Sequence, residues 1–132
     1  MMKKTRVLAF VLLGCAVLVG IVRMTFRSHH VEAVVLRPGT IAAEDAAAHV
    51  GQSITVEGIV SEVHVSGRVT FIDLGGRYPN EEFTGVIFSE NYGAFPDMTK
   101  LQGQTIDISG TVQLYGERPE IVLKSANKIR RR

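Results

Sequence analysis

The sequence predicts an all-β fold, a five-stranded Greek-key barrel preceded by an N-terminal transmembrane helix. Within residues 70–88, two alternating strands are joined by a loop rich in Gly, Pro and Asn, as expected of neighbouring antiparallel strands. A longer alternating segment precedes this unit and two more follow it, and such a succession of short strands is typical of a barrel or a sandwich. An uncharged apolar run stands before all of them and predicts the helix.

The first strand is predicted over Ser53 to Val65. Its apolar residues keep one alternating phase up to Gly58 and the opposite phase beyond it. A glycine at a change of phase indicates a bulge or bend, which would let one strand serve both sides of a small barrel. Before this strand, Thr40 is predicted to cap a short helix that runs through two acidic residues to His49.

The remaining elements follow from the same alternation and from turn residues. Ser66-Gly67 and Gly75-Gly76 mark turns, and a segment with Phe95, Pro96 and Met98 interrupts the strands. The predicted elements are a second strand over Arg68 to Leu74, a third over Phe83 to Ser89, a short plug over Asn91 to Leu101, a fourth strand from Ile106 to Leu114, and a fifth over Glu120 to Lys124.

The N-terminal segment predicts location. Lys3, Lys4 and Arg6 precede an apolar run from Val7 to Val22, which is close to the roughly 17–25 residues of a spanning helix. Three basic side chains before the run against two after it favour a cytoplasmic N-terminus. We therefore expect a membrane protein with a single-pass, uncleaved N-terminal anchor and an extracytoplasmic domain.

Two alternatives for this segment stay open. Cys15 is the only cysteine, so an intramolecular disulfide is excluded. It follows Leu12-Leu13-Gly14, which resembles a lipoprotein cleavage box, so Cys15 could carry a lipid; a cleaved signal would instead give a secreted protein. Against the lipoprotein, the apolar run continues to Val22.

The chain divides into four predicted parts, and their charges differ. Residues 1–28 form the signal-anchor, 29–40 a linker, 41–129 the barrel domain and 130–132 a basic tail. Residues 31–132 contain 10 basic and 13 acidic side chains, a net charge of −3. Nucleic-acid binders normally have a basic surface, because neutralisation of phosphates supplies most of their affinity. The negative net charge of this domain shows no such surface.

Three segments resemble the OB-fold nucleic-acid-binding domains of the tRNA-anticodon type, namely Gly58 to Val60, Gly67 to Leu74 and Leu101 to Val112. The chain is similar to small exported, membrane-anchored bacterial OB-fold proteins in Phe71 to Asn80 and Tyr115 to Ile121. The resemblance covers about residues 50–129. It implies an OB-fold in the bacterial envelope and a ligand platform on the second and third strands.

The resemblance also implies binding residues. Phe71 stands where anticodon-type domains stack a phenylalanine on a base, although half of its strand must face inward, so core packing stays an alternative. The chain departs from the pattern at Gly75-Gly76, where Arg-Asp is usual, and at Gly85, where a polar base reader is expected. Such losses would leave only binding without base specificity. The rim loops add further candidates, Arg77, Tyr78, Tyr115 and Arg118.

Two functions follow from these residues. In the first, the module binds single-stranded nucleic acid non-specifically through Phe71, Arg77, Tyr78, Tyr115 and Arg118. In the second, the same rim holds an envelope protein or a small ligand, with no nucleic-acid role. A neutral or acidic platform would favour the second function.

The sequence predicts neither catalysis nor a metal or cofactor. Asp73, Glu81 and Glu82 are interpreted as surface acids, because no nucleophile and base pair, phosphate loop or metal-ligand spacing accompanies them. His49 and His64 are interpreted as polar side chains with satisfied hydrogen bonds.

Overall fold

The computed structural model describes residues 35–132, which form one compact unit from Val35 to Arg132. The apolar run from Val7 to Val22 and Cys15 lie outside the described residues, and so do the anchor and its alternatives. Within residues 35–132, no helix has the length and apolar character needed to cross a membrane.

The long strand β2 (Ser53–Ser66) organises the sheet by pairing with two antiparallel partners in turn. Its first half, up to Ile59, is antiparallel to β5 (Thr105–Thr111), and its second half, from Val60, is antiparallel to β3 (Val69–Leu74). The pairing register shifts between Val60 and Glu62. An irregularity of the kind that the sequence predicts at Gly58 thus lies further along the strand, between Val60 and Glu62, whereas pairing at Gly58 itself is regular.

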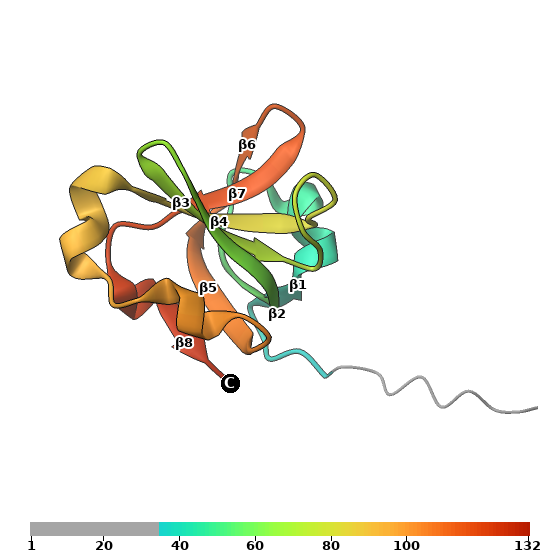
Figure 1. The fold of residues 1–132 in the computed structure, drawn as a ribbon. Coiled ribbons are helices and arrows are strands. Elements are labelled where there is room, and N and C mark those ends of the chain that lie inside the picture. Colours follow the sequence, from blue (N-terminus) through green and yellow to red (C-terminus); the bar gives the residue numbers. More distant parts are fainter. Residues whose placement is uncertain (1–34) are drawn as a thin grey trace, which may run out of the picture. The chain divides into compact units, whose positions relative to one another are not determined.

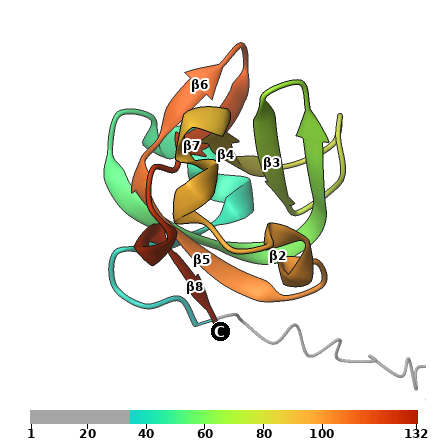
Figure 2. The same ribbon diagram turned by 60° about the vertical axis from the view of Figure 1, so that its left-hand side comes forward.

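The other strands extend this sheet on both sides. β4 (Phe83–Phe88) is antiparallel to β3, β7 (Arg118–Val122) is parallel to β4, and β6 (Gln113–Tyr115) forms a hairpin with β7. The resulting order is β6-β7-β4-β3-β2-β5-β8, and the strands curve around a common core (Figures 1 and 2).

The fold is all-β and OB-like. Strand pairing forms an open path from β6 to β8, so the closed five-stranded barrel of the prediction is not formed by hydrogen bonds within residues 35–132. β5 and β7 approach each other through side chains instead: a Cβ atom on Gly110 of β5 would lie 2.6 Å from Cγ2 of Ile121. The core between them is aliphatic with one aromatic ring, and its fully buried members include Ile72, Phe83, Ile108 and Ile121.

The N-terminal part of the domain differs from the predicted capped helix. Thr40 begins a short strand, β1 (Thr40–Ala42), which pairs in parallel with β2. A 3-10 helix η1 (Ala43–His49) follows, with no side-chain cap. Backbone pairing with β2 uses the residues that would otherwise form the first turn. The predicted plug consists of two more 3-10 segments, η2 (Ser89–Ala94) and η3 (Met98–Leu101).

Of the C-terminal residues 130–132, predicted as a basic tail, Arg130 and Arg131 belong to the sheet and Arg132 follows it. After η4 (Ala126–Lys128), β8 (Ile129–Arg131) pairs with β5. The Arg132 guanidinium lies 2.9 Å from Asp107 and 2.6 Å from Glu57. The Asp107 side chain is only 3% exposed, so Arg132 neutralises a carboxylate that burial would otherwise penalise.

Candidate ligand-binding groove

A groove of about 530 Å³ lies between the β2–β3 hairpin and the β6–β7 hairpin, whose tips stand apart at the top of Figure 2. The groove includes the face on which OB-folds bind ligands, because β3, β4 and the loops beside them line it together with the end of the long strand β2. The residues that line the groove are His64, Val65, Ser66, Phe71, Asp73, Tyr78, Glu81, Thr84, Tyr115, Arg118, Pro119 and Glu120.

Four of the five predicted site residues line this groove. Phe71 comes from β3, Tyr78 from the loop after it, and Tyr115 and Arg118 from the β6–β7 hairpin. The tyrosines are the most exposed of them, at 63% for Tyr78 and 77% for Tyr115. Arg77 is exposed and does not line the groove.

Phe71 is neither a fully buried core residue nor a fully exposed stacking platform, the two alternatives that the sequence left open. Its side chain is half-buried and faces the groove, while its neighbour Ile72 is fully buried in the core. The ring stacks on the imidazole of His64, directly across the β2–β3 pair, with centroids 5.0 Å apart and planes inclined by 20°. One face of the ring is therefore already occupied by His64.

Arg118 is held in place by two groups of the groove. Its guanidinium carbon lies 4.7 Å from the centre of the Tyr78 ring, within the range of a cation–π interaction. Its Nη1 donates to Oε1 of Glu81 at 2.9 Å. The Glu81 side chain is only 4% exposed, so the positive charge of Arg118 is matched by a nearly buried negative one.

Asp73 is the residue that the sequence analysis misjudged most. The interpretation of Asp73 as a surface acid is wrong: the residue is 1% exposed, one position before the end of β3. The same interpretation of Glu81 is wrong too, because its side chain is 4% exposed. Oδ1 accepts a hydrogen bond from the Thr84 hydroxyl at 3.1 Å, and Oδ2 lies 3.3 Å from Nδ1 of His64. Burial raises the pKa of Asp73, and His64 and the Thr84 hydroxyl counteract this only in part.

Carboxylates outnumber cations in the groove. Asp73, Glu81 and Glu120 are acidic, and Arg118 is the one arginine or lysine among the lining residues. Glu120 is 8% exposed and accepts a hydrogen bond from Gln113 at 2.7 Å. Two buried carboxylate oxygens, Oδ2 of Asp73 and Oε2 of Glu81, have no hydrogen-bond donor in the part of the chain that the structure describes.

Glycine stands at both places where the chain departs from the anticodon-type pattern, and the structure shows why a side chain does not fit there. Gly75 has φ of +74°, a conformation that favours glycine, and at Gly76 a Cβ atom would lie 2.4 Å from the backbone oxygen of Asn80, so the loop passes too close there for a side chain. Gly85 faces the core, where a Cβ atom would lie 2.9 Å from Ile108. The expected base-reader position therefore does not face the groove in this chain; its neighbour Thr84 does.

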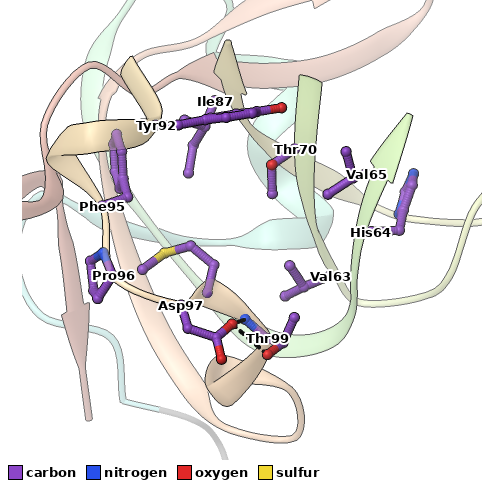
Figure 3. A pocket seen from close by; sticks show the side chains of 11 residues that line it. Val63, His64, Val65, Thr70, Ile87, Tyr92, Phe95, Pro96, Asp97 and Thr99 are labelled. Carbon is purple, nitrogen blue, oxygen red and sulfur yellow. Dashed lines mark hydrogen bonds between the residues drawn. The ribbon is translucent and has the colours of Figure 1, made fainter. Parts of the chain in front are cut away.

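A second pocket, smaller and more apolar, lies on the other side of the end of β2. Figure 3 shows Tyr92 and Phe95, from the segment after β4, across the pocket from Val63 and Val65. Its volume is about 230 Å³, and Asp97 at its edge accepts hydrogen bonds from the amide and hydroxyl of Thr99. None of the predicted site residues lines this pocket.

Sequence reasoning missed His64, Asp73 and Glu120 as groove residues. One sequence signal could have revealed Asp73, namely an aspartate inside the otherwise apolar strand Phe-Ile-Asp-Leu. A charged side chain in such a strand must face a polar site or a partner. The register that places His64 opposite Phe71 could not be read from alternation alone.

No protein-family model matches the chain, and no curated protein does. Among solved structures, the chain is similar to a putative aspartyl-tRNA synthetase from Leishmania major Friedlin, with 16% identity, 76% of this chain and 22% of that chain covered, and a TM-score of 0.48. The chain thus spans about a fifth of the length of the synthetase.

Two OBody structures are similar at the same level. OBody AM1L10 bound to hen egg-white lysozyme has 20% identity, 74% of this chain and 97% of that chain covered, and a TM-score of 0.49. OBody AM3L09 bound to the same protein has 18% identity, 73% and 96% coverage, and a TM-score of 0.49. Because the TM-scores are below 0.5, these similarities show neither the fold nor the function of this chain. The fold follows from its strand topology.

Proposed function

We propose that this chain is a non-enzymatic binding module that holds a partner protein by a lysine or arginine side chain placed in the groove. The observation that carries the proposal is the pair of buried carboxylate oxygens, on Asp73 and Glu81, that lack a hydrogen-bond donor within residues 35–132. Leaving a buried charged acceptor without a donor costs free energy, and an ammonium or guanidinium group offers three to five donors and no acceptor.

Single-stranded nucleic acid, which the resemblance implies, is the second candidate. Phe71, Tyr78 and Tyr115 favour it, because aromatic side chains in a groove can stack on bases. The charge of the groove opposes it: a phosphate would meet three carboxylates and an Arg118 that is already paired with Glu81. The same aromatic rings can also pack against the aliphatic stem or the charged end of a basic side chain.

A labelled peptide of alternating lysine and glycine provides the test of the proposed function. Fluorescence anisotropy with the full chain in a non-ionic detergent should show salt-sensitive binding. Asp73→Asn and Glu120→Gln should each weaken it about tenfold or more, because a hydrogen bond to a charged group is worth about 1.5–3 kcal/mol and each 1.4 kcal/mol is tenfold.

Glu117→Gln is the matched control for these variants. Glu117 is exposed in the same hairpin and does not line the groove, so its loss should leave the affinity unchanged. Equal affinity in all three variants, or equal binding of a peptide in which glutamate replaces lysine, would refute the proposed function.

We also infer that the apolar run from Val7 to Val22 keeps the intact chain in a bacterial membrane with the domain outside the cytoplasm. The uncharged length and the basic flank support this inference. The intact protein should be found in the membrane fraction. In a separate experiment, protease added from outside the cell should remove the domain. A soluble domain that lacks residues 1–22 would show a cleaved signal, and lipid on Cys15 would show a lipoprotein.

A further inference from the structure

Three side chains with metal-ligating atoms meet on one face of the β2–β3 pair. Glu62 lies directly opposite Asp73, and His64, two residues further along β2, projects from the same face. One carboxylate oxygen of each acid and one imidazole nitrogen all lie within 4.8 Å of one another. The convergence therefore follows from strand register and is independent of any loop.

The contact between His64 and Asp73 is close but is not a hydrogen bond. Nδ1 of His64 and Oδ2 of Asp73 are 3.3 Å apart, yet neither atom has a hydrogen-bond partner among the described residues. Both atoms are buried, and the Asp73 side chain is only 2% exposed. Buried polar atoms without a hydrogen-bond partner need an explanation, and an ion that is bound by both atoms is one.

The neighbouring residues hold these atoms in position. Thr84 donates to Oδ1 of Asp73 and thus fixes the carboxylate with Oδ2 toward His64. Phe71 stacks on the imidazole of His64 and fixes the plane of the ring. Supporting contacts of this kind orient the ligands of metal sites.

We propose that Glu62, His64 and Asp73 form a binding site for a divalent transition-metal ion, with Zn²⁺ as the expected occupant. Zinc binds imidazole nitrogen and carboxylate oxygen at about 2.0–2.2 Å, so adjacent ligands of a tetrahedral ion are about 3.4 Å apart. The pair of His64 and Asp73 is 3.3 Å apart, and Oε2 of Glu62 is 4.0 Å from the same His64 nitrogen, within reach after a small side-chain rotation because Glu62 is partly exposed. Mixed nitrogen and oxygen ligands favour this ion over Ca²⁺ or Mg²⁺, which prefer oxygen alone.

The fourth ligand would be a water molecule or a group of the bound partner. His64 and Asp73 line the groove, so the ion would lie at its edge. Metal binding goes beyond the proposed function and does not rest on it. Because both would use Oδ2 of Asp73, zinc and a basic side chain of the partner should compete for that atom.

The test uses zinc sulfate alone and the full chain in a non-ionic detergent, after removal of metal with a chelator. Isothermal titration calorimetry should show one zinc ion per chain. His64→Gln and Asp73→Asn should each weaken binding by about tenfold or more, as loss of a ligand should weaken it at least as much as the 10–100-fold caused by loss of a supporting residue. Circular dichroism of each variant verifies that it folds.

Other histidines provide the controls. His49 hydrogen-bonds Gln52 away from the three ligands, and His29 and His30 precede the described domain, so His49→Gln and the double change His29→Gln and His30→Gln should bind zinc as the wild type does. In nuclear magnetic resonance spectra, zinc should shift the imidazole signals of His64 and leave those of His49 in place. No zinc binding by the wild type would overturn the proposal, as would binding that survives His64→Gln and is lost with His29 and His30.

Discussion

Replacing Phe83 with alanine is expected to lower the free energy of unfolding by about 3–5 kcal/mol, the usual cost of removing a buried phenylalanine. Phe83 is 0% exposed and is the largest fully buried side chain of the core. It begins β4 and pairs with Leu74, at the point where the groove-forming loop leaves and rejoins the sheet. Since a small domain has only about 5–15 kcal/mol of stability, the loss should be evident in urea denaturation followed by circular dichroism.

Phe88→Ala is the matched control on the same strand. Phe88 ends β4 and is 37% exposed, so the same truncation should cost about 1 kcal/mol or less. If the two variants were equally stable, the strand would not have the buried and exposed ends that this fold assigns to it.

Replacing Arg118 with methionine is expected to lower the free energy of unfolding by about 2 kcal/mol, because it leaves the Glu81 carboxylate without its cation. Glu81 is 4% exposed at its side chain, and loss of one partner of a fully buried pair costs about 3–5 kcal/mol. The expected loss is smaller because the Arg118 side chain is 42% exposed. Packing of the guanidinium on Tyr78 contributes to it.

The double variant Arg118→Met and Glu81→Gln separates the charge from the packing. Once Glu81 is neutral, the uncompensated negative charge is gone, so the double variant should be more stable than Arg118→Met alone. Thermal or urea unfolding of the four members of this cycle measures the coupling. Additive losses would show that Glu81 does not depend on Arg118 for its charge compensation.

The strands could be predicted from sequence because each buries alternate side chains, and alternation is a local property. β2, β3 and β4 lie within a residue of their predicted bounds for this reason. β1 and β8 could not be predicted in this way, since each has three residues and exists only through pairing with a distant strand. Arg132 is a further example. In the sequence, three terminal arginines are typical of a solvated tail, and only the structure shows that Arg132 pairs with the buried Asp107.

The aromatic residues and Arg118 of the groove could be predicted from the sequence, and its buried acidic residues could not. Tyr78 is in a loop, and Tyr115 and Arg118 flank the turn of the β6–β7 hairpin. Exposed aromatic and basic residues at such places indicate binding surfaces directly. Asp73 is buried in a strand, and its meaning depends on which residues of β2 and β4 face it. That register is a tertiary property, so the acidic character of the groove became visible only in the structure.

The central claim, that the groove accepts a cation in preference to a phosphate, is tested most directly by competition between two probes. The full chain is first saturated with the labelled peptide of alternating lysine and glycine, and unlabelled oligothymidylate or unlabelled peptide is added at low salt. The unlabelled peptide should displace the labelled peptide and lower the anisotropy. The oligonucleotide should not displace it, once the binding of labelled peptide to the oligonucleotide has been measured separately and subtracted. Direct binding of the oligonucleotide to the chain that weakens with salt and is lost in Phe71→Ala, with no binding of the peptide, would contradict the account and support nucleic acid as the ligand.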